Sequence, residues 1–267
     1  DALIFDLEDL CPVDQKTEAR KICRAYIEKL GAAMKIYVRV NALDTGRTRD
    51  DIEAVAVAGL EGVLLPKVES PGTIRIVEAI LDEIERKRGL PVGGIEISIL
   101  LETATGVRLA YEICSASRRV GSVCVGTAEN ADLQTDLGYA WSVEGIEMHY
   151  ARSKVLLDAR SAGIENILDG TYANFGDEAG LIAASEMARR MGFRGREIVQ
   201  PIQVATVNRV FSPTPAEIAY WRRLIEVFDA AMAQGSAFAD LNGKLVDYAM
   251  VGNARRMLAW AASLKLV

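Results

Sequence analysis

The sequence predicts an α/β protein built as a (β/α)8 barrel, and three observations support this fold class. Short apolar segments alternate with longer amphipathic segments along the 267 residues, as strands and helices do in a parallel sheet covered by helices. Polar residues follow nearly every predicted strand, as they do around the mouth of a barrel. No GxGxxG or Walker pattern follows any strand, which weakens the dinucleotide-binding and nucleotide-binding interpretations of an open sheet.

Seven strands are predicted, and most of them end on charged or polar side chains. They cover Ala2 to Phe5, Lys35 to Val40, Gly62 to Leu65, Ile97 to Leu101, Ser122 to Val125, Ile164 to Leu168 and Arg196 to Gln203. A helix is predicted after each of the first six. A barrel of this type has eight strands, and the sequence begins directly on a strand. We therefore expect that a strand and helix precede Asp1, or that another element closes the barrel.

The C-terminal region adds helices beyond those that cover the strands. A helix is predicted from Pro215 to about Gln234, followed by a turn containing Gly and Asn and a last helix from about Gly252. We predict a barrel domain over residues 1–212 and a helical extension over residues 213–267.

Composition limits the class of partner and the compartment. A net charge of -6 argues against a nucleic-acid or anionic-membrane surface, because such partners call for a basic face. No apolar run reaches the length of a membrane span, and no signal peptide is recognised. The four cysteines lack metal-binding spacing. We expect a cytoplasmic protein with reduced thiols and no structural zinc.

The buried strand ending at Leu101 stops on the carboxylate of Glu102. An acid at the carboxyl end of a parallel strand can serve as a metal ligand or a base. It can also simply precede the predicted helix 107–117, whose dipole would stabilise it. The polar loop after the fifth strand supplies further acids, Glu129, Asp132 and Asp136.

Eight segments resemble, in order, the citrate lyase β-subunit family, within the group of hydroxyacyl-CoA lyases and class II 2-oxo-acid aldolases related to malate synthase. The resemblance implies a barrel of the phosphoenolpyruvate/pyruvate type with a C-terminal helical lid. Family members usually begin with a strand and helix ahead of the DLED strand. The segments are DALIFDLED, VRVN, LPKVES, LLETATGV, DLQTDLG, IVQPIQ, FSPTPAE and DLNGKLVDYAMVGNARRML.

The resemblance implies a magnesium ion held by Glu102 and Asp132. Magnesium prefers oxygen ligands and usually combines one or two carboxylates with water and substrate oxygens. Alignment of the loop backward from Gly138 selects Asp132, whereas alignment forward from Gly126 would select Glu129. We favour Asp132.

Three further residues take roles from the resemblance. Arg39 matches an arginine that contacts a carbonyl or carboxylate oxygen of the substrate, although an ion pair with a neighbouring acid (Asp6, Glu8 or Asp9) is also expected of it. Lys67 either binds substrate or neutralises the acidic mouth. Asp247 matches a lid aspartate that acts as acid/base in a neighbouring subunit, and its alternative is a solvent-facing loop acid.

The sequence departs from the family at Gln200, which replaces the histidine of a common IHPxQ strand. Glutamine can form hydrogen bonds but cannot exchange a proton near neutral pH. The only histidine, His149, is predicted to lie in the middle of a helix in a structural role. No Ser/His/Asp or Cys/His set is found.

These features predict a magnesium-dependent carbon–carbon lyase acting on a citryl, malyl or citramalyl thioester, on CoA or on a carrier protein. The alternatives are a class II aldolase acting on a free 2-oxo acid and a barrel that survives as a binding or assembly subunit. We expect a homo-oligomer, a trimer or a multiple of it, whose partners are an acyl-CoA or a small hydroxy or oxo acid.

Overall fold

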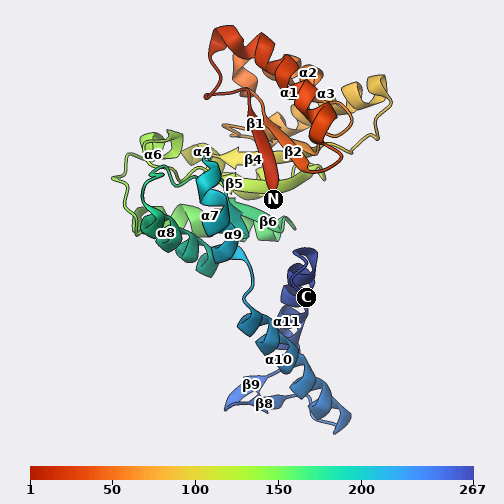
Figure 1. Cartoon of the computed structure of the whole chain (residues 1–267), viewed down its shortest axis with the longest axis vertical. Coiled ribbons are helices and arrows are strands. Elements are labelled where there is room, and N and C mark those ends of the chain that lie inside the picture. Colours follow the sequence, from red (N-terminus) through yellow and green to blue (C-terminus); the bar gives the residue numbers. More distant parts are fainter. The chain divides into compact units, whose positions relative to one another are not determined.

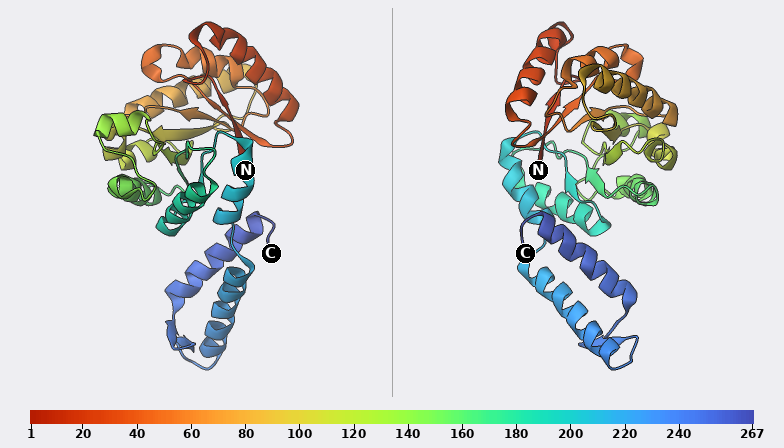
Figure 2. Two further views of the ribbon diagram at one scale, coloured as in Figure 1. Left: turned by 60° about the vertical axis from the view of Figure 1, so that its left-hand side comes forward. Right: turned by 90° about the vertical axis from the view of Figure 1, so that its right-hand side faces the viewer.

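Seven parallel strands form one curled sheet in the computed structural model, which describes residues 1–267. The strands pair in chain order, so the edges of the sheet are β1 and β7, and helices lie along its outer face (Figures 1 and 2). This confirms the predicted parallel α/β architecture. The strands are β1 (Ala2–Asp6), β2 (Lys35–Arg39), β3 (Gly62–Leu65), β4 (Glu96–Leu101), β5 (Val120–Val125), β6 (Asn166–Asp169) and β7 (Gly195–Arg196).

Several of the helices that follow the strands begin at a residue whose side chain caps them. Ser70 caps the helix that Pro71 opens, and Asp177 caps the helix that follows β6. The helices that follow the strands are α1 (Lys16–Leu30), α2 (Thr48–Val55), α3 (Pro71–Arg88), α4 (Ala104–Arg108), α5 (Ala110–Cys114), α6 (Asp132–Leu137), α7 (His149–Ser161), α8 (Glu178–Met191) and α9 (Val204–Phe211).

The interior of the curled sheet is lined by alternate residues of successive strands. Leu64, Leu100 and Cys124 pack together there, with Leu168 against them. Because side chains alternate along a strand, Leu101 points away from Leu100, and the next residue turns back toward the interior. The strand order and this alternation together bring polar residues to the carboxyl ends of the strands.

The chain forms two compact units, residues 1–207 and 208–267. In the second unit, α10 (Pro215–Ala233) packs on α11 (Tyr248–Ser263), and the hairpin of β8 (Ala239–Leu241) and β9 (Lys244–Val246) joins them. The buried residues of this unit are Ile218, Trp221, Leu224, Phe228, Ala239, Val246, Val251, Ala254 and Ala261. The predicted division at residue 212 stays a prediction.

No helix has both the length and the apolar content required to cross a membrane. The four cysteines are free and buried.

The predicted seventh strand is much shorter than expected. Only Gly195 and Arg196 pair with β6, and the chain then leaves the sheet. Pro201 opens a short 3-10 helix, η4 (Pro201–Gln203), in which Gln200 and Gln203 form reciprocal capping bonds. Proline cannot donate to a strand ladder and suits the first turn of a helix. The apolar residues of IVQPI predicted a strand, but Pro201 starts a helical turn instead, so the predicted length of this strand was wrong.

Two other stretches fold differently from their prediction. The polar loop after β5 contains α6, which begins at Asp132. The predicted helix that contains His149 starts with a 3-10 turn, η3 (Ile146–Met148), so His149 is the exposed first residue of α7 and not a mid-helix residue. The hairpin in the second unit was not predicted beyond its turn.

A buried ion pair joins α3 to the start of β5. Glu85 is fully buried, and its carboxylate accepts N–H bonds from Arg119 at 3.0 Å, Ile95 at 2.8 Å and Gly93 at 2.8 Å. Burial raises the pKa of Glu85, but these donors outweigh burial and lower it. Glu85 therefore stabilises the folded state above its unfolded pKa, and this contribution is lost as the pH falls through its lowered folded value.

Replacing Arg119 by methionine should destabilise the protein by about 3 kcal/mol at neutral pH, because it leaves a charged carboxylate buried without its cation. Urea unfolding measures the change. Arg86→Met is the matched control, since Arg86 forms an exposed ion pair with Asp82 and should cost less than about 0.5 kcal/mol. Equal effects of the two substitutions would contradict this account.

Candidate active site

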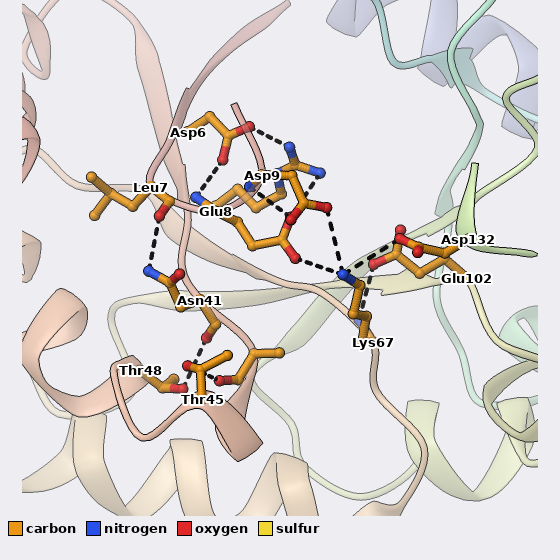
Figure 3. A network of polar contacts seen from close by, with 12 residues as sticks. Asp6, Leu7, Glu8, Asp9, Asn41, Thr45, Thr48, Lys67, Glu102 and Asp132 are labelled. Atoms are coloured by element: carbon orange, nitrogen blue, oxygen red, sulfur yellow. Dashed lines mark hydrogen bonds and ion pairs between the residues drawn. The ribbon is translucent and has the colours of Figure 1, made fainter. Parts of the chain in front are cut away.

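The carboxyl ends of β1 to β4 gather most of the charged residues of the candidate site. Asp6 and Arg39 occupy paired positions of β1 and β2, and Arg39 in turn pairs with Leu64 of β3. Paired residues of parallel strands face the same side of the sheet, so the two charged side chains point into the same interior. Figure 3 shows the resulting network.

Arg39 lies between two acids of the β1 end. Its Nη2 donates to Asp6, and its Nη1 lies 3.4 Å from Oε2 of Glu8. Burial lowers the pKa of Arg39, but Asp6, Glu8 and Glu102 raise it above its ordinary value. The expected ion pair with the neighbouring acids is confirmed, and the guanidinium keeps further N–H donors for another oxygen.

Buried polar contacts with the backbone carbonyls of Leu7 and Glu8 hold the loop after β1 in place. Lys16 donates to the backbone carbonyls of Leu7 at 2.7 Å and Glu8 at 2.8 Å, and Asn41 donates to the Leu7 carbonyl at 2.8 Å. The Glu8 side chain is only 6% exposed. Burial raises its pKa by more than Arg39 and Lys67 lower it.

Lys67 contacts four carboxylates through two different groups. Its Nζ lies 3.1 Å from Glu8, 3.5 Å from Asp9 and 3.5 Å from Asp132. Its backbone N–H donates to Oε1 of Glu102 at 3.1 Å. The backbone of Lys67 has φ +52°, a left-handed conformation that an L-residue rarely adopts and that directs this N–H toward the site.

Glu102 follows β4 and is buried, with 6% of the residue exposed. Gly126, after β5, packs so closely that a Cβ there would lie 2.6 Å from Cβ of Glu102. Burial, together with the charges of Asp132 and Glu8, raises the pKa of Glu102 to about 8. Its carboxyl is thus placed in the interior without a full counter-charge.

Asp132 is the first residue of α6, and its side chain is 47% exposed. Asp136, one turn later, accepts the backbone N–H of Ala104 at 2.6 Å and so fixes α6 against the segment that follows Glu102. Figure 3 shows the carboxylates of Asp132 and Glu102 side by side next to Lys67. Glu129 is exposed, and its charge acts on Tyr172, outside this cluster.

The start and end of the loop that carries Asp132 are both tied to a buried acid of β6. The Thr127 hydroxyl donates to Asp169 at 2.9 Å. Arg152 donates to Asp169 at 3.0 Å and to the carbonyl of Gly145 at 3.3 Å. These contacts fix the two ends of the loop.

The donor set of Glu102 and Asp132 fits a hard dication such as magnesium. Both donors are carboxylates, and the ammonium of Lys67 already lies against Asp132 as a positive charge in the position where a cation would be stabilised. No group of three or more His, Cys, Asp and Glu side chains is arranged as a metal site. Magnesium needs only one or two carboxylates, because water and substrate oxygens complete its coordination.

Asp247 lies in the second compact unit, away in sequence from the other candidate residues. It caps α11, and its Oδ1 accepts the N–H groups of Ala249 at 3.0 Å and Met250 at 3.1 Å. The structure thus gives Asp247 a local structural contact as the cap of α11. Its acid/base role stays a prediction.

Glu8 and Asp136 are the residues that sequence reasoning treated least completely. Glu8 was considered only as an ion-pair partner of Arg39, whereas it also binds Lys67. Asp136 was counted among the loop acids without a role. The three acids of DLED could have signalled the first, but the helix that positions the second was not predicted.

The pH dependence of stability should report the environment of Glu102 when divalent cations are chelated. Because its folded pKa of about 8 lies above its ordinary value of 4.5, its contribution is full below the ordinary value and is lost as the pH rises toward 8. The free energy of unfolding by urea should fall by a few kcal/mol over this range. Glu102→Gln should flatten this dependence, and an unchanged slope in the variant would contradict it.

The first unit matches a known protein family over nearly its whole length. The family described as HpcH/HpaI aldolase/citrate lyase matches residues 1–201. The citrate lyase subunit beta of Leuconostoc mesenteroides subsp. cremoris is 33% identical over 100% of this chain and 87% of its own. A (3S)-malyl-CoA thioesterase of Cereibacter sphaeroides is 37% identical over 99% of this chain and 87% of its own.

A solved structure shares both the fold and part of the sequence. Protein CitE from Mycobacterium tuberculosis, in complex with magnesium, acetoacetate and coenzyme A, has a TM-score of 0.74 and 27% identity. The similarity covers 98% of this chain and 90% of that chain.

Proposed function

Because this chain belongs to the HpcH/HpaI aldolase/citrate lyase family, we propose that it is a magnesium-dependent carbon–carbon lyase acting on a 3-hydroxyacyl thioester of the citryl, malyl or citramalyl type. The observation that carries this proposal is that Glu102 and Asp132 both contact Lys67, near Arg39, at the carboxyl ends of the strands. The relative solved with magnesium and coenzyme A supports the cofactor and the thioester class.

In the proposed reaction, Glu102 and Asp132 hold the magnesium ion. When bound, the ion supplies Lewis-acid stabilisation of an oxygen that carries developing negative charge. Arg39 contributes a second positive group with fixed orientation, because Asp6 and Glu8 hold two of its donor directions. Its remaining N–H donors bind a carbonyl or carboxylate oxygen of the acid part of the substrate.

Cleavage requires one proton to leave the substrate hydroxyl and one proton to reach the new thioester. Loss of the hydroxyl proton to a base lets the adjacent carbon–carbon bond break, which yields an oxo acid and the enolate of an acyl thioester. Protonation of that enolate carbon by an acid completes the reaction. We assign both transfers to Asp247 of a neighbouring subunit, which would take the hydroxyl proton as base and return it to the enolate carbon as acid.

A second candidate function is hydrolysis of the same kind of thioester. The relative that is 37% identical over 99% of this chain is a (3S)-malyl-CoA thioesterase, which favours this candidate as the alternative. A class II aldolase on free 2-oxo acids is less well supported, because the only histidine is the exposed first residue of α7. A binding or assembly subunit without turnover is the remaining alternative.

The products formed in the presence of magnesium from (3S)-malyl-CoA, citramalyl-CoA and free hydroxy-oxo acids distinguish these functions. Release of acetyl-CoA together with an oxo acid identifies the lyase. Release of free CoA thiol with the intact hydroxy acid identifies the thioesterase. Pyruvate released from free hydroxy-oxo acids identifies the aldolase, and the absence of every product across this panel would support the binding subunit.

Arg39→Lys should abolish most turnover while the protein stays folded. Lysine keeps the charge but loses the planar fork that binds two oxygens at once, so kcat/KM should fall by about 100-fold or more. Circular dichroism and thermal unfolding provide the check on folding. Near wild-type kcat/KM would remove Arg39 from the proposed substrate contacts.

The assembly proposal is that the second unit acts on a neighbouring subunit, in a trimer or a multiple of it. Leu245 and Tyr248, which flank Asp247 in the sequence, are 58% and 61% exposed, so apolar surface is available for a partner. Mixing Asp247→Ala protein with Arg39→Ala protein under conditions of subunit exchange should restore activity. If labelled subunits exchange and no activity returns, Asp247 does not act across an interface.

A further inference from the structure

Lys67 is the one residue that contacts both carboxylates proposed to hold the metal. Its backbone N–H binds Glu102, and its ammonium lies 3.5 Å from Oδ2 of Asp132. The same ammonium lies 3.1 Å from Oε1 of Glu8 and 3.5 Å from Oδ2 of Asp9. One residue therefore links the pair Glu102 and Asp132 to a second pair of acids, through its backbone N–H at Glu102 and through its ammonium at the other three.

The two ends of this link differ in how firmly they are held. Glu8 is 6% exposed and is fixed by its buried loop, whereas the Asp132 side chain is 47% exposed. The Lys67 side chain is 34% exposed, and its four-carbon stem allows the ammonium to move while the backbone N–H stays on Glu102. The ammonium can leave Asp132 and keep its contact with Glu8.

A dication held by Asp132 needs the carboxylate oxygens that the ammonium now shares. Two positive charges a few ångströms apart repel each other strongly in a partly buried site. Binding of the dication must therefore drive the ammonium away from Asp132, toward Glu8, Asp9 or a new anion.

We propose that Lys67 is an internal counter-ion that competes with the divalent cation for Asp132, and that this competition couples cation binding to binding of the anionic acid part of the substrate. This inference rests on the proposed metal ligands. The displaced ammonium keeps Glu8 but gains a replacement for Asp132 only when a substrate carboxylate arrives, so each ligand tightens binding of the other. Lys67 thus gives Asp132 a positive partner before substrate enters.

The test measures magnesium affinity by isothermal titration calorimetry, with and without acetoacetate as the anionic probe. Lys67→Gly removes the ammonium and suits the left-handed backbone of this position. We expect it to bind magnesium alone about tenfold more tightly than the wild type. Acetoacetate should tighten magnesium binding in the wild type and much less in this variant.

Three further variants control the experiment. Lys67→Met removes the charge but keeps a long side chain, so it should give the same direction of change and guards against an effect of glycine on folding. Lys67→Arg keeps the charge and should stay within about threefold of the wild type. Lys87→Met removes an exposed lysine that pairs with Glu53 at 2.9 Å, and it should leave magnesium affinity unchanged.

Weaker or unchanged magnesium binding in both Lys67→Gly and Lys67→Met would overturn the competition while leaving the metal site intact. Tighter binding with undiminished coupling to acetoacetate would overturn the coupling. If the wild type does not bind magnesium with or without acetoacetate, and Glu102→Gln shows the same magnesium affinity as the wild type, the metal site on which the proposed function rests would be removed instead. Thermal unfolding of each variant confirms that a folded protein is measured.

Discussion

The ion pair between Asp6 and Arg39 is the contact on which the organisation of the candidate site depends. Parallel register places these residues opposite each other on β1 and β2, with both side chains directed to the interior. Arg39 then binds Glu8, Glu8 binds Lys67, and Lys67 reaches Glu102 and Asp132. A shift of one residue in this register would turn Arg39 toward the helices and disconnect the chain of contacts.

The buried acids Glu85 and Glu102 have opposite electrostatic surroundings at the two ends of the parallel strands. At one end, Glu85 receives a cation and two backbone N–H groups, and its pKa is lowered. At the mouth, Glu102 receives one backbone N–H and has acidic neighbours, and its pKa is raised to about 8. The first arrangement stabilises the fold, whereas the second leaves the Glu102 carboxyl without a full counter-charge. Such uncompensated acids at strand ends are typical of functional sites.

The sequence predicted those parts of the fold that depend on local patterns. Apolar segments located the first six strands and the helices after them, because hydrophobic periodicity acts within a few residues. The length of β7 was wrong, since the apolar run after Arg196 looks like a strand until Pro201 and its capping glutamines act. Strand-end position singled out Glu102, whereas the role expected of Arg39 came from the family resemblance.

The geometry that completes the site depends on contacts that no local pattern encodes. The left-handed backbone of Lys67 follows from its neighbours in space, and lysine has no special preference for it. The position of Asp132 likewise depends on α6, which the contact of Asp136 with Ala104 holds against the segment after Glu102. Long-range contacts of this kind had to be observed.

The same cluster can serve bond cleavage or hydrolysis, and the reason lies in what its residues bind. Arg39, Lys67 and the proposed cation are all positive, so together they recognise the oxygens of the acid part of a substrate. That recognition is common to a lyase and a thioesterase on the same thioester. The two reactions differ in the group that attacks or protonates the thioester end: an acid for the enolate carbon in one case, and an activated water in the other. The residues that decide between them must therefore lie toward the thioester, beyond the carboxylates at the strand ends, and in the proposed assembly Asp247 of a neighbouring subunit is the candidate.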